Sequence, residues 1–396
     1  MSAEALIPVA AAQAAVLALA RVTQDEVVPL IRASGRVLAR DVVASADQPP
    51  FAASAMDGYA VAAPARPGER LRVIGTAQAG AAYRGRVGPG EAVRIFTGAP
   101  VPAGTVQVVI QEDAVETAGI VQIGENLTQS LNIRPQGADF KSGFTVSAGR
   151  RLRPVDIGLI AAMRVGALSV RRRPVVAILP TGDELVMPGD PAGPAQIAAS
   201  NTFALAAMAE AEGAEARLLP IARDDPAALE HGLGLAAGAD LIVTVGGASV
   251  GDHDLVRPVT ERMGIDRAFY RVALRPGKPL QAGRLGAAAF LGLPGNPVSA
   301  IVCGAVFMVP LLRAMQGLPA LAPPRSGVLM RDLPPNGPRT HYMRARLGPG
   351  SPPGLDPYPD QDSARLALLA EADALLIRPA GAPAARAGDA AEWLAL

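Results

Sequence analysis

Residues 240–254 read D-L-I-V-T-V-G-G-A-S-V-G-D-H-D, a buried-strand pattern followed at once by a glycine-rich turn. Leu241 to Val245 is rich in β-branched residues and shows no polar alternation, which is typical of a strand covered on both faces in a parallel α/β sheet. In open α/β sheets, ligands lie beyond the carboxyl ends of the strands. The sequence therefore predicts that this turn lies at a ligand site.

The turn combines residues that suit an anion with residues that suit a cation. Its glycines let a ligand approach the backbone and its serine adds a hydroxyl group; these residues are Gly246, Gly247, Gly251 and Ser249. Asp252 and Asp254 close the turn with two carboxylates, and carboxylates beside a phosphate cradle indicate a divalent cation between them. For this stretch alone, a tight turn capped by solvated aspartates is an equally good interpretation.

The composition limits the kind of protein. A chain of 396 residues is too long for one core, so roughly two to four domains are expected. The apolar stretch near the N-terminus follows Glu4 and lacks a basic region, so we expect an amphipathic helix rather than a signal peptide, and no membrane span. Cys303 is the only cysteine, which favours the reducing cytoplasm, and a net charge of +1 without basic blocks argues against nucleic-acid binding.

Changes of pattern along the chain predict several units. Helical periodicity marks the first 45 residues, where a second helix is expected from Glu26 to the break at Gly35, and another helix is expected from Val155 to Met163. Short strands and Gly/Pro turns follow from Arg70 to Val121 and again near the C-terminus. The expected units are a discontinuous scaffold of residues 1–48 and 140–172, an inserted β-rich domain of 49–139, an α/β domain with a mostly parallel sheet of 173–318, and a small barrel-like β domain of 325–396.

Acidic residues recur at successive strand ends of the expected α/β domain. One strand is followed by Glu184, the next by Asp224 and the central one by Asp254, while Lys278, one of only two lysines, follows another segment. Turn preference alone explains this recurrence poorly. Because the carboxyl ends of parallel strands meet at one edge of the sheet, we expect these side chains to converge on one site. Asn296 can cap a helix that Pro297 begins.

Nine short motifs occur in an order that resembles the molybdopterin molybdenumtransferase family, the bacterial MoeA type whose fold the gephyrin-like E domains share. They are S-A-M-D-G-Y-A at 54–60, F-T-G-A-P-V-P at 96–102, N-I-R-P-Q-G-A-D at 132–139, T-G-D-E-L at 181–185, S-N at 200–201, D-D at 224–225, G-G-A-S-V-G-D-H-D at 246–254, P-G-K-P at 276–279 and G-L-P-G-N-P-V-S-A at 292–300. Each alone could be loop chemistry. The ordered set covers nearly the whole chain.

The resemblance implies an activity and its requirements. Members of the family insert molybdate into adenylylated molybdopterin and release AMP with the help of Mg²⁺. They act as homodimers whose sites are shared between subunits. A molybdopterin adenylyltransferase and apo-molybdoenzymes are possible protein partners.

The resemblance also implies roles for individual residues. The expected catalytic residues are Asp57, Thr97, Asp139, Glu184, Asp224, Asp254 and Lys278, with Glu184 and Asp254 as metal ligands. The expected molybdopterin and nucleotide site comprises Gly246, Gly247, Ser249, Gly251, Pro294, Gly295, Asn296 and Pro297. The expected molybdate pocket comprises Ser249, Arg275, Lys278, Arg344 and Ser363.

Some positions depart from the family pattern. Ala52 and Ala53 replace a polar pair, Val106 replaces an aspartate, Arg275 replaces a lysine and Asp362 replaces a glycine. Arginine keeps the charge of lysine but presents a planar fork instead of a point donor. These departures leave open the use of tungstate and a non-catalytic or weakly active molybdopterin-binding scaffold, although the intact acidic set argues against a scaffold. A third interpretation is an adenylyl-transferring enzyme whose single-domain fold resembles residues 174–317, but the additional domains favour metal insertion.

Overall fold

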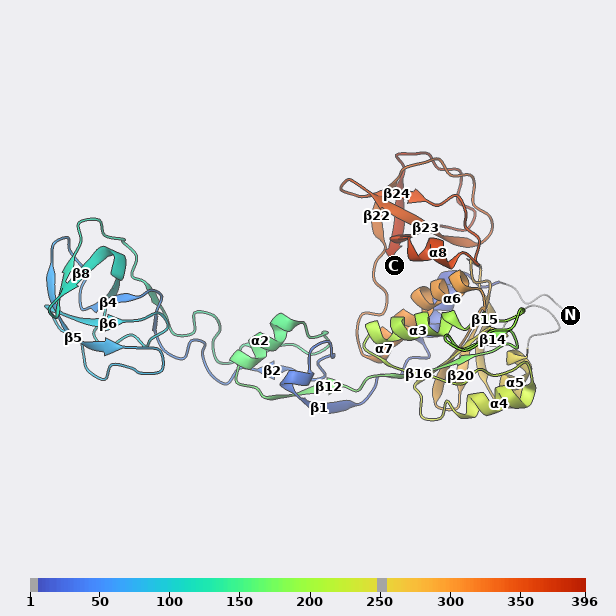
Figure 1. Cartoon of the computed structure of the whole chain (residues 1–396), viewed down its shortest axis with the longest axis horizontal. Helices are drawn as coiled ribbons and strands as arrows, with labels where there is room; N and C mark the ends of the chain where they lie inside the picture. The colour runs from blue at the N-terminus through green and yellow to red at the C-terminus, as the bar shows by residue number, and fades with distance from the viewer. Residues whose placement is uncertain (1–5, 248–254) are drawn as a thin grey trace.

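The computed structural model describes residues 6–247 and 255–396 and shows an elongated molecule (Figure 1). A β-rich unit lies at one end, a scaffold lies in the middle, and an α/β unit lies at the other end with a small β-barrel beside it. The multidomain α/β-plus-β fold predicted from the sequence is thus confirmed.

The α/β unit is built on a six-stranded sheet in the order β16-β13-β17-β21-β20-β18. Its strands are β13 (Val175–Pro180), β16 (Glu215–Leu218), β17 (Leu241–Val245), β18 (Asp266–Arg271), β20 (Pro279–Leu285) and β21 (Ala288–Leu293). The first four strands in that order run parallel, and β20 pairs in antiparallel fashion with both β21 and β18. Every residue of β17 is buried, as its apolar pattern predicts.

Helices cover both faces of this sheet. α4 (Pro226–Gly234) and α5 (Val256–Arg262) pack on one face, through a core that includes Leu179 and Ile242. The other face carries α1 (Val9–Leu17), α3 (Ser200–Ala211), α6 (Pro297–Cys303) and α7 (Val309–Met315). Because side chains alternate across a strand, consecutive strand residues pack in the hydrophobic cores on opposite faces of the sheet.

The structure corrects the expected assignment of residues 1–48 to the scaffold. α1 packs in the core of the α/β unit, where Val9, Ala12 and Val16 are buried against α7 and the sheet. Gln13 Nε2 donates to Val306 O at 3.2 Å. The first helix therefore belongs to the α/β unit, and the scaffold begins after it.

One helix among the described residues is long and apolar enough to cross a membrane. It runs from Pro297 to Met315, with α6 and α7 joined by a π-helical turn at Gly304–Met308. It is 72% buried inside the protein. Its apolar surface is that of a core helix of the α/β unit.

The scaffold pairs segments that are far apart in sequence. β1 (Asp25–Pro29) is antiparallel to β12 (Ala167–Arg171), and β2 (Val42–Val43) is antiparallel to β11 (Thr145–Val146). α2 (Pro154–Ala162) packs beside them, close to its predicted range. The predicted helix from Glu26 is wrong: these residues form β1 and a 3-10 turn at Leu30–Arg32, because Val27 and Val28 favour a strand and Pro29 disfavours a helix interior.

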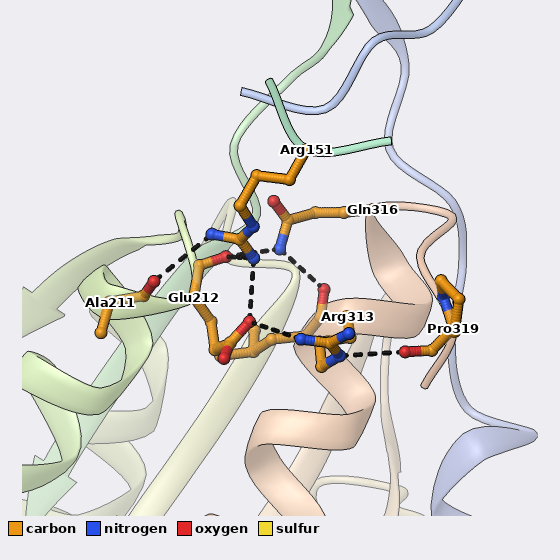
Figure 2. A network of polar contacts seen from close by, with 7 residues as sticks. Arg151, Ala211, Glu212, Arg313, Gln316 and Pro319 are labelled. Atoms are coloured by element: carbon orange, nitrogen blue, oxygen red, sulfur yellow. Dashed lines mark hydrogen bonds and ion pairs between the residues drawn. The ribbon is translucent and has the colours of Figure 1, made fainter. Parts of the chain in front are cut away.

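Polar contacts around Glu212, made by Arg151, Gln316 and Arg313 and here called the joint, connect the scaffold to the α/β unit (Figure 2). The Arg151 guanidinium donates to Glu212 O at 2.9 Å and to Glu212 Oε2 at 2.8 Å, beyond the end of α3. Gln316 Nε2 donates to the same carbonyl oxygen at 2.7 Å, and Arg313 lies 3.6 Å from the Glu212 carboxylate. Gly213 has a φ of +81° and a Cβ there would lie 3.2 Å from Arg151 Nη1. The joint thus links the scaffold to the ends of α3 and α7.

The β-rich unit contains a six-stranded sheet in the order β7-β4-β6-β5-β9-β8. Its strands are β4 (Gly58–Val61), β5 (Arg70–Ala77), β6 (Glu91–Ile95), β7 (Gln107–Ile110), β8 (Ala114–Thr117) and β9 (Ile120–Ile123). The short pair β3 (Ala53–Ser54) and β10 (Ile133–Arg134) joins the segments that enter and leave the unit.

The C-terminal unit is a closed barrel. Its strands are β22 (Arg325–Leu329), β23 (Thr340–Gly348), β24 (Gly354–Pro357), β25 (Ala374–Arg378) and β26 (Ala390–Ala395), and the short helix α8 (Leu366–Ala370) lies between β24 and β25. β23 pairs with both β24 and β25, which closes the ring. The short strands expected near the C-terminus are thus present, and β26 is the last of them.

Candidate active site

The carboxyl edge of the α/β sheet contains a topological switch point. From β13 the chain crosses to β16 on one side, and it later returns to form β17 on the other side of β13. Parallel sheets bind ligands in the crevice at such a point. The segments that follow β13 and β17 begin at Thr181 and Gly246, and they line one hollow of about 70 Å³ together with Glu184, Asn201 and Pro297.

Two glycines of the central turn are required by the backbone. Gly246 has a φ of +99°, and a Cβ there would lie 2.5 Å from Thr181 O. Gly247 has a φ of +63°, and a Cβ there would lie 2.6 Å from the Val256 side chain. Side chains are therefore excluded at both positions. Ser249, Gly251, Asp252 and Asp254 lie outside the described residues.

A reciprocal contact holds the loop that carries Glu184. Asp183 Oδ1 accepts from the Asp224 backbone N at 3.1 Å, and Asp224 Oδ2 accepts from the Asp183 backbone N at 3.4 Å. Arg223 donates to Asp183 O at 2.9 Å. Asp224 is thus brought to the Glu184 loop as expected. The sequence reasoning missed Asp183, although its place beside Glu184 in T-G-D-E-L was an available signal.

A second hollow, of about 360 Å³, also borders the start of α6. It is lined by cationic and hydroxyl-bearing residues and one carboxylate, among them Arg275, Lys278, Asn296, Arg339, Asp362 and Ser363. Gly295 and Pro297 line the first hollow, and Asn296 between them lines the second. Asn296 Nδ2 donates to Ser363 Oγ at 3.0 Å. The barrel therefore contributes to a pocket at the edge of the α/β unit.

The Lys278 turn rests on the core of the α/β unit. Gly277 has a φ of +112°, and the buried Cys303 Sγ lies directly beneath it, 3.9 Å from Gly277 O. Burial raises the pKa of the Cys303 thiol, so the group is kept neutral. Glycine is required at position 277 both by its backbone angle and by this sulfur.

Arg344 does not line either hollow and is only 1% exposed. Its guanidinium donates to Arg365 O at 3.0 Å and to Asp360 O at 3.1 Å, and its backbone N donates to Gln361 Oε1 at 3.0 Å. Burial lowers the pKa of this guanidinium. The expectation that Arg344 lines the molybdate pocket is not met; it supports the segment that carries Ser363.

The remaining expected residues lie elsewhere in the chain. Thr97 donates to Asp57 Oδ1 through both its backbone N and its Oγ1, at 2.7 Å each. The Thr97 backbone N–H, then its hydroxyl group and finally the nearby Arg94 lower the pKa of Asp57, although partial desolvation opposes them. This pair belongs to the β-rich unit, which the scaffold separates from the α/β unit (Figure 1). One chain therefore does not bring Asp57, Thr97 and Asp139 together with Glu184 and Lys278.

Within residues 6–247 and 255–396, no group of three or more His, Cys, Asp or Glu side chains is arranged to hold a metal ion. Mg²⁺ is usually bound by only one or two carboxylates together with substrate phosphates. The single Glu184 carboxylate at the first hollow fits that mode of binding.

Family models match three consecutive parts of the chain. Residues 7–163 match the MoeA N-terminal region (domain I and II), residues 177–314 match a probable molybdopterin binding domain, and residues 326–396 match the MoeA C-terminal region (domain IV).

Individual proteins are similar over most of the chain. The molybdopterin molybdenumtransferase 2 of Mycobacterium tuberculosis (strain H37Rv) is 37% identical over 381 residues, which cover 93% of this chain and 94% of the relative. The molybdopterin molybdenumtransferase of Nostoc sp. is 38% identical over 304 residues, or 74% of this chain and 70% of the relative. The crystal structure of a molybdopterin biosynthesis MoeA protein from Pyrococcus horikoshii has a TM-score of 0.83 at 28% identity and covers 99% of both chains. The chain belongs to the MoeA family of molybdopterin molybdenumtransferases.

Proposed function

We propose that the protein inserts molybdate into adenylylated molybdopterin and releases AMP, as a step of molybdenum cofactor biosynthesis in the cytoplasm. The observation that carries the proposal is that the start of α6 borders two hollows, the first through Gly295 and Pro297 and the second through Asn296. One presents the Glu184 carboxylate beside a glycine turn, and the other presents the Lys278 ammonium beside Ser363. The pair suits a substrate that carries a phosphoanhydride at one end and reacts with an oxyanion at the other.

The second hollow, which Lys278 and Arg275 line, suits molybdate. Lys278 and Arg275 supply positive charge, and Ser363 and Asn296 supply hydrogen-bond donors. Asp362 lines the same hollow, and its negative charge opposes anion binding. Gly246, Gly247 and the segment Pro294–Pro297 would hold the pterin and phosphate side, where glycine lets a ligand approach the backbone.

The first hollow, which Glu184 lines, suits cleavage of the phosphoanhydride. Water adds to phosphorus, the bridging oxygen leaves with one phosphate, and the products are AMP and the phosphate of the pterin. Glu184 and Asp254 would hold Mg²⁺, which when bound neutralises charge on the phosphates. Asp183 and Asp224 would position the Glu184 loop through their reciprocal contact.

A homodimer would complete the site. Asp57 and Thr97 belong to the β-rich unit and Asp139 lies where that unit joins the scaffold, whereas Glu184 belongs to the α/β unit beyond the scaffold, so a second subunit is the simplest source of these groups. The scaffold also exposes apolar side chains suited to an interface: Val27 is 75% exposed, Ile31 84% and Val155 67%. A molybdopterin adenylyltransferase and apo-molybdoenzymes are the protein partners consistent with this step.

One assay separates this proposal from the alternatives. Purified protein is incubated with adenylylated molybdopterin, Mg²⁺ and molybdate, and AMP and metallated pterin are measured. We expect both products. Binding without AMP release would indicate a molybdopterin-binding scaffold, and adenylylation of molybdopterin from ATP would indicate the enzyme of the preceding step. A parallel reaction with tungstate measures the choice of metal.

A further inference from the structure

A hollow of about 610 Å³ lies at the amino edge of the α/β sheet, opposite the edge that carries the candidate active site. Asp240 precedes β17, Ala288 begins β21 and Leu285 ends the antiparallel strand β20, and all three residues line this hollow. The five residues of β17 separate it from Gly246 by about 16 Å of strand. The hollow is therefore separate from both hollows of the candidate active site.

The floor of the hollow reaches the hydrophobic cores on both faces of the sheet. Leu19 and Met315 belong to the core that α1 and α7 cover, whereas Leu233 and Ile242 belong to the core that α4 and α5 cover. None of these four residues is more than 9% exposed. Small-molecule pockets are mostly apolar and have volumes of about 300–1,000 Å³. The floor and the volume thus suit the apolar body of a small molecule.

Two arginines give this apolar hollow a positive charge. The Arg284 guanidinium donates to Leu19 O at 2.7 Å and to Ala287 O at 3.2 Å, so backbone oxygens hold it in place. Arg21 is exposed, and within the described part of the chain its side chain has no hydrogen-bond or ion-pair partner. Burial and then the charge of Arg21 lower the pKa of Arg284, while Asp266 opposes them. An anion between the two guanidinium groups would relieve their repulsion.

Asp240 supplies the one carboxylate among the described residues that line the hollow, and this carboxylate is already engaged. Its Oδ1 and Oδ2 accept from the Arg172 guanidinium at 2.7 Å and 3.0 Å. Oδ2 also accepts from Val175 N at 2.7 Å, at the start of β13. The carboxylate thus anchors the segment that enters β13 and does not pair with Arg21 or Arg284.

A ligand that satisfies both the floor and the charge is an anion with an apolar body. A guanidinium pairs with a carboxylate, sulfonate or phosphate through two parallel N–H bonds. We propose that this hollow is a second binding site of the protein, and that it takes a small organic anion with an aromatic or aliphatic body. The anionic group pairs with Arg21 and Arg284, and the body rests on Leu19, Leu233 and Ile242. This inference goes beyond the proposed function, because the hollow includes none of the residues assigned to that function.

The test titrates the full-length protein with 2-naphthoate and, separately, with the uncharged 2-naphthamide, and measures binding by ligand-observed NMR. Sulfate supplies an anion without an apolar body. Arg21→Gln removes the unpaired charge, and Ala237→Trp adds an indole ring to the lining from an exposed position. The matched controls are Arg84→Gln, an exposed arginine of the β-rich unit, and Ala11→Trp, on the exposed side of α1. Circular dichroism establishes that each variant is folded.

We expect 2-naphthoate to bind at least about tenfold more tightly than 2-naphthamide or sulfate, because only 2-naphthoate uses both the charge and the floor. Arg21→Gln should remove most of its advantage over 2-naphthamide, and Ala237→Trp should weaken binding of both naphthyl compounds. Both controls should leave the affinities unchanged. The inference is overturned if 2-naphthoate does not bind, if 2-naphthamide or sulfate binds as tightly, or if Arg21→Gln weakens 2-naphthoate no more than Arg84→Gln does.

Competition distinguishes this site from the candidate active site. Because adenylylated molybdopterin is proposed to bind at the other edge of the sheet, a saturating amount of it should leave 2-naphthoate bound. Displacement of 2-naphthoate would place the probe in the active site, which would overturn this inference and leave the proposed function unaffected.

Discussion

Thr97 donates two hydrogen bonds to one oxygen of Asp57, from its backbone N and from its Oγ1, both at 2.7 Å. Both bonds favour the charged carboxylate and so lower its pKa, the backbone bond having the larger effect. Asp57 is thereby kept ionised at neutral pH and held in one orientation at the surface of the β-rich unit. In the proposed dimer, this ordered carboxylate would face the substrate bound by the partner subunit.

Replacing Thr97 by valine should make activity more sensitive to acid. Thr97→Val removes the hydroxyl donor and keeps the backbone donor, so the pKa of Asp57 should rise part of the way toward its ordinary value. If ionised Asp57 is needed, the acidic limb of the rate profile should move to higher pH, with little change above neutral pH. AMP release measured across pH checks this, with Thr117→Val on β8 as the control. An unchanged acidic limb would contradict a role for the ionised Asp57.

Glu184→Gln should slow AMP release by about a hundredfold or more, because the amide keeps the shape of the side chain but removes its charge. Glu184 lines the hollow at the switch point and is exposed, so the folded state should tolerate the change. Single-turnover release of AMP is the measurement. Glu215→Gln, at the start of β16 and thus at the opposite edge of the sheet, should retain full activity. Equal rates of AMP release for the two variants would show that Glu184 is not part of the active site.

His341 should make the stability of the folded protein sensitive to mild acid. It is 6% exposed, and its burial, assisted by Arg275, Arg339 and Arg344, lowers its pKa from 6.5 to about 4. On the unfolded chain, His341 therefore binds a proton at higher pH than on the folded chain. The part of the unfolding free energy that depends on a neutral His341 is fully present above pH 6.5 and is lost as the pH falls toward 4.

Replacing His341 tests this account. His341→Gln removes the titrating group, so urea unfolding at a series of pH values should show a smaller loss of stability for the variant between pH 6.5 and 4. The difference should be at most roughly 3 kcal/mol. His231→Gln on the solvent side of α4 is the control. Parallel pH profiles for His341→Gln and the unmutated protein would show that His341 does not control this dependence.

The joint around Glu212 should restrain the angle between the scaffold and the α/β unit. Arg151→Ala removes the guanidinium contacts with Glu212 shown in Figure 2. We expect small-angle X-ray scattering to report a broader distribution of shapes, and the unfolding free energy to fall by about 1–3 kcal/mol. Arg173→Ala, in the connecting segment and without a side-chain partner among the described residues, is the control. Identical scattering for the two variants would show that other contacts set the angle.

Local patterns predicted the α/β unit well. β17 matches its predicted range because burial on both faces leaves a continuous apolar run in the sequence. α6 begins at Pro297, as the sequence predicts. The meeting of Glu184, Asp224 and the glycine turn followed from the rule that parallel strands end at one edge.

Contacts between distant segments could not be predicted in this way. Nothing in the composition of α1 indicates that it packs against α7, and the joint links Arg151 to a residue 61 positions later in the chain. The burial of Arg344 could not be predicted, because its partners are two backbone carbonyl oxygens and the Gln361 side chain, all brought to it by the fold of the segment 360–365. The helix expected from Glu26 does not form, because Val27 and Val28 favour a strand and Pro29 disfavours a helix interior.

The claim that two subunits share one site is tested most directly by mixing inactive variants. Asp57→Asn removes the carboxylate of the β-rich unit and Glu184→Gln removes that of the α/β unit, so each homodimer should be inactive. In a mixed dimer one site carries both changes and the other carries neither. After equal amounts are mixed under conditions that exchange subunits, AMP release should recover to about a quarter of the rate of the unmutated dimer. Recovery no greater than the sum of the two separate variants, with light scattering and mass spectrometry showing that mixed dimers have formed, would contradict a shared site.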